Sequence, residues 1–260
     1  MKTIRFDGPF AVFSDVHGNL AALEAIVADV QARGVADTIC LGDLVGYGPS
    51  SNEVALRVRD LGIPSLMGNY DQGIGFETGD CGCVYKTDEQ RAEGAVSLDW
   101  TQRVVTAEAK AYLRTLEDRF VLQTPAGDLL AVHGSPRRIN EYLFEDRPLS
   151  AMARMAAQEP YRAILFGHTH VPYVREVPRE PAGETTAFVN VGSAGRPKDG
   201  DWRVCYAVVD PTKLAMGKSF VEFVRVPYDY QRLLDDLAAT PLVTSFTAPP
   251  RSGTESIVNE

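Results

Sequence analysis

All four histidines of this 260-residue chain follow short apolar runs of the kind that form β-strands. Two carboxylates and one amide take the same place after such runs. A single histidine at a strand end is more often a hydrogen-bonded structural residue than a ligand, but here no histidine is used elsewhere. The residues that share this placement are Asp15, His17, Asp43, Asn69, His133, His168 and His170.

Imidazole, carboxylate and amide groups without a thiolate suit borderline-hard divalent cations such as Mn²⁺, Fe or Zn²⁺. Seven such groups suffice for two ions, and a carboxylate can bridge the two. A divalent cation lowers the pKa of a bound water to about 7, so that hydroxide forms near neutral pH. The sequence therefore predicts a metal site with hydrolytic chemistry.

The first third of the chain repeats one unit: an apolar β-type run, a turn with glycine, and a helix. The runs lie at 11–14, 38–41 and 65–67. Asn19 is placed to cap one helix, and Ser50 with Glu53 forms a predicted capping box for the next, which ends near Leu61. Alternation of strands and helices predicts a largely parallel sheet, and ligands bind beyond the carboxyl ends of such strands. We expect the seven polar residues to meet in one crevice.

Residues 72–118 have the pattern of a helical insertion, with a glycine-rich loop and then helices beginning at Thr87 and Thr106. Beyond them short strands dominate, and helices are expected only at about 148–159 and 229–239. The predicted strands are 119–124, 128–132, 162–166, 171–177, 186–191, 203–209 and 218–226. We expect one domain of two packed sheets over residues 1–246, and a loose C-terminal tail over 247–260.

The composition excludes several classes of protein. An apolar fraction of 45% without a run of about 18 apolar residues predicts a soluble globular protein with no membrane role. A net charge of -9 argues against a nucleic-acid coat protein and requires local positive charge for any anionic substrate. No leader is visible, and Cys81 and Cys83 miss the C-x-x-C spacing of redox and zinc sites, so a cytoplasmic protein is expected.

Five short motifs carry a resemblance to a known family. They are D-V-H-G (15–18), G-D (42–43), G-N-Y-D (68–71), V-H-G (132–134) and G-H-T-H (167–170). With these motifs in this order, the chain resembles the calcineurin-like metallophosphoesterase superfamily over about residues 10–210. In size it is similar to the small bacterial phosphodiesterases of the YfcE type. The resemblance implies an α/β fold, a four-layer α/β/β/α sandwich of two mixed sheets.

The resemblance also implies two divalent metal ions, Mn²⁺ foremost, with Fe, Zn, Ni or Co as alternatives. Asp15, His17 and His170 would bind the first ion. Asn69, His133 and His168 would bind the second, and Asp43 would bridge both. A water or hydroxide between the ions would attack the phosphorus of a small phosphodiester. The predicted catalytic residues are Asp43, Asn69 and Tyr70. With every histidine assigned to metal, none remains as a general acid.

Tyr70 departs from the family pattern G-N-H-(D/E), in which a histidine assists the leaving group. A phenol with a pKa near ~10 is poorly matched to proton transfer at neutral pH. The small bacterial members are similar in often lacking this histidine. We therefore expect phosphodiester rather than phosphoprotein substrates. The alternative role for Tyr70 is that of an aromatic ring packed beneath the metals.

Substrate contacts are predicted at Asn19, Arg138 and Ser193. Arg137, Asn140 and Arg196 are weaker candidates, and a surface ion pair is the competing role for each arginine. Two other functions stay open: a phosphatase acting on dinucleoside polyphosphates or phosphomonoesters, and a non-catalytic scaffold on this fold, as in a retromer subunit. A homo-oligomer is also left open.

Overall fold

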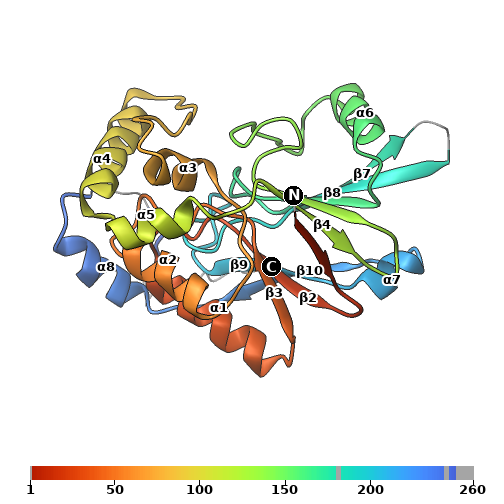
Figure 1. Ribbon diagram of the computed structural model, residues 1–260, viewed down its shortest axis with the longest axis horizontal. Coiled ribbons are helices and arrows are strands. Elements are labelled where there is room, and N and C mark those ends of the chain that lie inside the picture. Colours follow the sequence, from red (N-terminus) through yellow and green to blue (C-terminus); the bar gives the residue numbers. More distant parts are fainter. Residues whose placement is uncertain (1, 180–182, 243–245, 250–260) are drawn as a thin grey trace, which may run out of the picture.

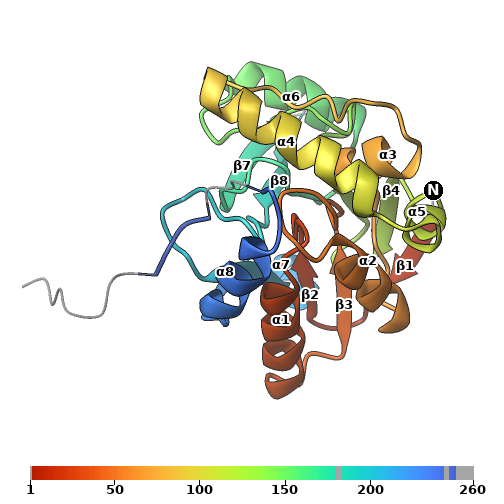
Figure 2. The same ribbon diagram turned by 90° about the vertical axis from the view of Figure 1, so that its left-hand side faces the viewer.

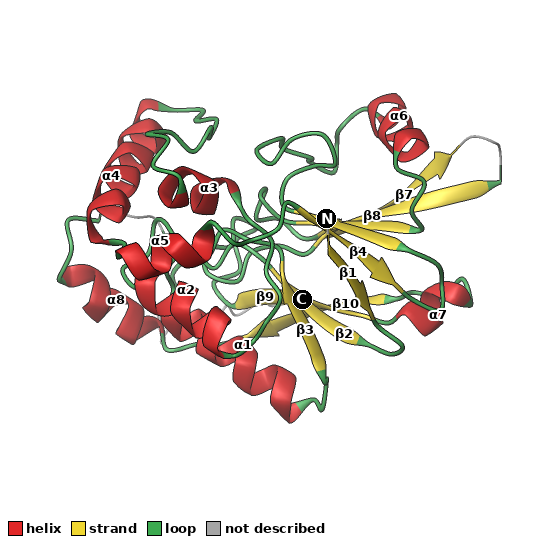
Figure 3. Cartoon of the chain, in the orientation of Figure 1, coloured by secondary structure: helices red, strands yellow, loops and turns green. Residues whose placement is uncertain are grey.

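The structure, a computed structural model, describes residues 2–179, 183–242 and 246–249. Its described strands form two mixed sheets that face each other (Figures 1 and 3). The six-stranded sheet has the order β1 (Lys2–Arg5), β4 (Arg119–Gln123), β5 (Leu129–Val132), β6 (Ala163–Phe166), β8 (Glu184–Asn190) and β7 (Tyr173–Arg179). The four-stranded sheet has the order β10 (Val221–Val226), β9 (Val204–Val209), β2 (Phe10–Phe13) and β3 (Asp37–Cys40).

Helices cover the outer face of each sheet. α1 (Leu20–Ala32), α2 (Ser51–Asp60) and α8 (Tyr230–Ala238) pack on the four-stranded sheet, and α6 (Leu149–Gln158) packs on the six-stranded sheet. α3 (Asn69–Gly75), α4 (Asp88–Val104) and α5 (Ala107–Leu113) gather at one end, on the left of Figure 1. In Figure 2 the long helix α4 crosses the face turned to the viewer. A short helix, α7 (Pro211–Ala215), follows β9.

Alternating side chains divide each central strand between two apolar cores. Phe10 and Val12 of β2 pack between the sheets, whereas Phe13 lies in the core shared with α1 and α2. In β6, Leu165 lies between the sheets and Phe166 faces α6. Because successive residues of a strand point to opposite faces, each central strand is apolar on both faces. The expected four-layer α/β/β/α sandwich is confirmed.

Two of the expected elements are wrong. Ser65 and Leu66 form only single bridges, to Cys40 and Glu117, and not a third strand of the parallel unit. The glycine-rich loop expected after residue 72 begins instead as helix α3, which extends to Gly75. Gly73 weakens helix propensity, but a Cβ there would meet Cys81 Sγ at 2.7 Å. Close packing of the following loop therefore outweighs the local preference.

Other local predictions also need correction. Ser50 is the N-cap of α2, but its side chain makes no capping hydrogen bond, so the capping box is absent. Strand β1 and helix α7 were not predicted, because four or five residues are too few to show a period and β1 is mostly exposed. Thr247, at the start of the predicted tail, donates a hydrogen bond to the Pro197 carbonyl, while residues 250–260 lie outside the described residues. In the described ranges, none of the helices has the length and apolar character needed to cross a bilayer.

Candidate metal centre

The structure brings all seven predicted ligands together at the carboxyl ends of the central strands. Asp15 and His17 follow β2, and Asp43 follows β3. His133 follows β5, and His168 and His170 follow β6. Asn69 does not follow a strand but is the first residue of helix α3. Every one of the seven residues is buried, with at most 3% of its surface exposed.

Two groups form within this set. In one, Asp15, His17 and His170 offer ligand atoms that all lie within 4.8 Å of one another, and Asp43, His133 and His168 do the same in the other. His170 Nε2 lies 3.3 Å from Asp15 Oδ1 and 3.2 Å from His17 Nε2. Asn69 joins the second group, because its Oδ1 lies 3.1 Å from His133 Nε2.

Asp43 lies between the two groups. Its Oδ2 atom is 3.7 Å from His17 Nε2 and 3.4 Å from His133 Nε2. Its Oδ1 atom accepts a hydrogen bond from the backbone N–H of Tyr70 at 2.8 Å, which fixes the rotation of the carboxylate. One oxygen of Asp43 is therefore presented to both groups at once.

Backbone carbonyls orient three of the imidazoles. The Nδ1 atoms of His17, His133 and His170 lie 3.1, 2.9 and 2.6 Å from the carbonyl oxygens of Val45, Leu41 and Arg196. A carbonyl can only accept, so Nδ1 carries the proton and Nε2 is left with a lone pair. All three Nε2 atoms consequently face the crevice, and each presents its lone pair there when the imidazole is neutral, as in metal-binding histidines whose other ring nitrogen donates to a carbonyl.

Among the seven predicted ligands, two buried polar atoms make no hydrogen bond in the described part of the chain: Asp15 Oδ1 and His168 Nε2. An unsatisfied buried polar atom costs about 1–3 kcal/mol, so native structures rarely leave one without a partner. A divalent cation would be a partner for each of them. The donor set and these two atoms together fit a metal ion in each group.

For most of these groups the surrounding charges and burial favour the protonation state that binds metal, which is an ionised carboxylate or a neutral imidazole. Burial disfavours charge on Asp15 and Asp43, but the facing imidazoles outweigh it and hold both carboxyl pKa values below their ordinary range. Burial lowers the pKa of His17 and of His168 to about 3, so both imidazoles are neutral. At His133 burial is outweighed by the Asp43 carboxylate, which raises the pKa to about 9. A cation would there take the place of the imidazole proton.

Five of the seven ligands have left-handed backbone, with φ between 49° and 65°. This conformation costs a residue other than glycine about 1–3 kcal/mol, and it persists only where the surrounding structure enforces it. Such residues gather at functional sites. The five are Asp15, His17, Asp43, His168 and His170. The strain marks the crevice as a functional site independently of the residue types.

Asp71 has a role that the sequence analysis missed. Its buried carboxylate accepts hydrogen bonds from the backbone N–H groups of Asp43 at 2.8 Å, Leu44 at 2.9 Å, Val45 at 3.3 Å and Gly68 at 2.9 Å. Burial and the Asp43 carboxylate raise the pKa of Asp71 to about 7, whereas these N–H donors favour the charged form. Asp71 thus ties the Asp43 loop to the start of α3. The available signal was the last letter of the motif G-N-Y-D.

The loop of Cys81 and Cys83 orients Asn69. The amide Nδ2 of Asn69 donates to the Cys81 carbonyl at 3.0 Å and to Cys83 Sγ at 3.3 Å, so its Oδ1 faces His133. Burial raises the pKa of the Cys83 thiol to about 11, which keeps the thiol protonated at neutral pH. The two cysteines support the centre through Asn69 and are not predicted nucleophiles.

Tyr70 lies beneath the first group of ligands. Its ring is 1% exposed, meets the His17 ring edge-on at a centroid distance of 5.5 Å, and lies 4.9 Å from the Tyr47 ring. Gly46 makes room for it, since a Cβ there would collide with the Tyr70 ring. Burial raises the pKa of the phenol well above its ordinary value. These contacts match the alternative role of Tyr70, an aromatic ring packed beneath His17, and this role is the one we predict for it in place of an acid.

Two predicted substrate contacts have structural roles. Asn19 Oδ1 caps α1 through the N–H of Ala22 at 3.1 Å, and its Nδ2 donates to the Gly195 carbonyl at 3.0 Å. Ser193 Oγ donates to the Asp15 carbonyl at 2.8 Å and accepts from the N–H of Arg196 at 2.9 Å. Both side chains are fully buried. We therefore leave them out of the proposed substrate contacts.

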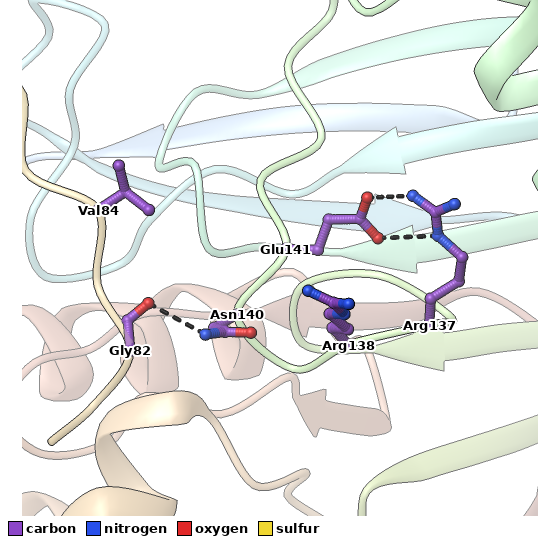
Figure 4. Close-up of a pocket in the computed structure, with 6 residues that line it drawn as sticks. All are labelled: Gly82, Val84, Arg137, Arg138, Asn140 and Glu141. Atoms are coloured by element: carbon purple, nitrogen blue, oxygen red, sulfur yellow. Dashed lines mark hydrogen bonds and ion pairs between the residues drawn. The ribbon is translucent and has the colours of Figure 1, made fainter.

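Three of the remaining candidates, Arg137, Arg138 and Asn140, line a cavity of about 610 Å³ that also includes Gly82, between Cys81 and Cys83 (Figure 4). Arg137 forms an ion pair with Glu141, the competing role considered for it, and Asn140 donates to the Gly82 carbonyl at 3.0 Å. Arg138 is exposed at the edge of the cavity and stays the predicted substrate contact. Arg196 pairs with Glu93 of α4 and lies over the Tyr47 ring at 4.1 Å.

A four-layer sandwich with imidazole and carboxylate ligands at its strand ends defines a metal-binding phosphoesterase. Residues 9–213 match the calcineurin-like phosphoesterase superfamily domain, and the chain belongs to this family. It is accordingly a hydrolase of phosphoesters, which confirms the family and enzyme class predicted from the motifs.

Known proteins similar to this chain extend over nearly its whole length. An uncharacterized protein of Methanocaldococcus jannaschii, MJ0912, is 31% identical over 246 residues, which are 89% of this chain and 93% of that protein. The crystal structure of a metallophosphoesterase from Sphaerobacter thermophilus is 31% identical, with a TM-score of 0.69 over 91% of this chain and 96% of that one. The hypothetical protein PH1004 of Pyrococcus horikoshii shares the fold, at 22% identity and a TM-score of 0.72 over 91% of this chain and 93% of that one.

A shorter similarity covers one segment of the chain. A 60-residue segment is 45% identical to a symmetrical bis(5'-nucleosyl)-tetraphosphatase of Pectobacterium carotovorum. The segment is 22% of this chain and 21% of that protein, so it bears on one part of the molecule only.

Proposed function

We propose that this protein is a two-metal phosphodiesterase. The observation that carries the proposal is the position of Asp43 Oδ2, which lies 3.7 Å from His17 Nε2 in one ligand group and 3.4 Å from His133 Nε2 in the other. A carboxylate oxygen between two sets of metal ligands is the arrangement that a bridging ligand requires.

Each group would bind one ion, the first through Asp15, His17 and His170 and the second through Asn69, His133 and His168. When bound, two divalent ions supply a water of lowered pKa and neutralise the charge that develops on the phosphate oxygens. The chain itself orients the ligands, through the carbonyls behind the imidazoles and through Asp71. It also supplies positive charge for the substrate at Arg138, which a protein of net charge -9 needs near the site.

The preference for diesters rests on Tyr70. A monoester with a poor leaving group benefits from a general acid whose pKa lies near the working pH. All four histidines lie in the ligand groups, and burial raises the pKa of the Tyr70 phenol still further from neutrality. A diester whose phosphate is activated by the two metal ions depends less on a general acid.

A phosphatase acting on dinucleoside polyphosphates is the second candidate. The 60-residue similarity to a bis(5'-nucleosyl)-tetraphosphatase favours it. A non-catalytic scaffold is not favoured, because the ligand groups are intact and such a scaffold has no need to retain them. Mn²⁺ as the native metal, the cytoplasmic location and a homo-oligomeric state stay predictions.

Turnover of bis(p-nitrophenyl) phosphate tests the proposal. Protein stripped with a chelator should regain activity when reloaded with Mn²⁺, Ni²⁺, Co²⁺ or Zn²⁺, and the Asp43→Ala variant should not. Comparison with p-nitrophenyl phosphate and a dinucleoside polyphosphate separates the two candidates. Activity no greater than that of Asp43→Ala with every metal would contradict both.

A further inference from the structure

A second cavity, of about 810 Å³, adjoins the metal centre. Tyr47, Tyr85, Tyr142, Phe144, Lys86 and Arg196 are among the residues that line it. We call it the aromatic cleft. It touches both ligand groups, because the Tyr142 ring lies 4.0 Å from the His168 ring and the Tyr47 ring lies 5.1 Å from the His17 ring. A phosphate at the metal centre would therefore carry its substituent directly into this cleft.

The outer part of the cleft presents an open aromatic face. The rings of Tyr142 and Phe144 are stacked, with centroids 5.7 Å apart and an interplanar angle of 12°. Phe144 is 40% exposed, so its ring is accessible to a ligand. Planar rings of this kind bind another planar ring by stacking.

The charged side chains of the cleft suit an anionic ligand. Those that line it are Lys86, Arg196, Lys198 and Glu93, which is three cations against one anion. Lys86 Nζ lies over the Phe144 ring, 5.5 Å from its centre. Arg196 already pairs with Glu93, so the two lysines are the cations placed for a ligand. The combination of stacked rings with flanking lysines matches an aromatic base attached to a phosphate.

We infer that the aromatic cleft binds the base of a nucleoside phosphodiester, stacked against Phe144 and Tyr142, while the phosphate lies at the metal centre. The inference rests on the proposed phosphodiesterase function and names its substrate class. Stacking of a base on one aromatic side chain contributes about five- to a hundred-fold in affinity when the side chain is replaced by alanine. An aliphatic or sugar substituent gains far less from these rings.

Two diesters with the same leaving group test the inference. Thymidine 5'-p-nitrophenyl phosphate carries a base, and ethyl p-nitrophenyl phosphate does not. The metal-loaded protein should favour the thymidine ester by about ten-fold in kcat/KM, and Phe144→Ala should lower that preference about five-fold or more. Phe144→Tyr should retain the preference because it keeps the ring. Leu149→Ala, which removes an equally exposed apolar side chain on α6 outside the cleft, should also retain it.

Binding of thymidine 5'-monophosphate, followed by saturation-transfer NMR, gives a second readout that needs no turnover. The base protons should receive saturation from the wild-type protein and lose most of it in Phe144→Ala. Equal kcat/KM for the two esters, or equal base saturation in both proteins, would overturn the inference and leave the phosphodiesterase intact. Turnover of neither ester would overturn the proposed function, whereas base saturation that depends on Phe144 would still support the cleft.

Discussion

The carboxylate of Asp71 accepts a hydrogen bond from the backbone N–H of Asp43 at a distance of 2.8 Å, although 27 residues separate the two in the chain. The same carboxylate binds the N–H groups of Leu44 and Gly68. The loop that presents the proposed bridging residue is thus held by a second, buried acid. The geometry of the centre depends on a residue that itself offers no atom to a metal ion.

Replacement of Asp71 by asparagine should therefore impair the centre without removing a ligand. The amide keeps one acceptor oxygen but turns an N–H₂ donor toward backbone N–H groups. We expect a loss of about 10- to 100-fold in metal affinity or in diester turnover, as for other residues that hydrogen-bond and orient metal ligands, and a loss of about 2–4 kcal/mol in the free energy of unfolding. Calorimetric metal titration and urea unfolding measure the two. Asp60→Asn, at an exposed carboxylate, serves as the control. Wild-type metal affinity in Asp71→Asn would show that Asp71 does not position the centre.

Tyr70 should behave as a floor for His17 and not as an acid. Tyr70→Phe keeps the ring contact with His17 and should keep diester turnover within about three-fold. Tyr70→His introduces a group that titrates near neutral pH and should raise turnover of p-nitrophenyl phosphate relative to the diester by about ten-fold or more. Steady-state kinetics on both esters decides between the roles. A hundred-fold loss in Tyr70→Phe would make the hydroxyl catalytic.

Metal removal should lower the thermal stability of the protein. Asp15 Oδ1 and His168 Nε2 gain a partner only when a cation binds, and an ion that binds the folded state alone stabilises it. Mn²⁺ at about a hundred times its dissociation constant adds about 2.7 kcal/mol, which is about 5–10 °C in Tm for a chain of this size. Differential scanning fluorimetry with a chelator and with metal gives the shift. Asp43→Ala should show less than half of it, and an unchanged Tm with every divalent metal would argue against the centre.

The ion pairs of the 199–203 loop predict a pH dependence of stability. Hydrogen bonds from Arg203 lower the pKa of Asp201 to about 2. Because the folded-state pKa is depressed, the contribution of Asp201 is full above its unfolded value near ~3.9 and is lost as the pH falls toward 2. The difference in unfolding free energy between the wild type and Asp201→Asn should therefore shrink between pH 5 and pH 2. Urea titrations across this range measure it, and a constant difference would refute the assignment.

The sequence predicted the sheets and the ligand set for the same physical reason. Burial on both faces makes central strands apolar throughout, so the polar residue after each strand is conspicuous, as Asp15 is after Phe13. These residues, in their order along the chain, form the five short motifs that carry the family resemblance. Helix α1 was also predictable from the sequence, because Asn19 caps it and Leu23, Ile26 and Val30 repeat on its buried face.

What the sequence did not reveal depends on contacts between distant segments. Helix α3 contains Gly73, whose place is set by Cys81 and not by propensity. The role of Asp71 follows from backbone N–H groups 26 to 28 residues earlier in the chain, and no local pattern encodes them. The left-handed backbone of His168 and His170 is likewise imposed by the assembled crevice. The aromatic cleft joins separate parts of the chain, among them those around Tyr47, Tyr85 and Tyr142.

We propose that the seven buried residues hold two metal ions with Asp43 between them. Elemental analysis of protein that has been stripped, reloaded with Mn²⁺ and freed of loose metal tests it most directly. We expect about two ions per chain in the wild type, and about one or fewer in Asp43→Ala, which loses the shared ligand. One ion or none per wild-type chain, with every divalent metal supplied, would contradict a two-metal centre.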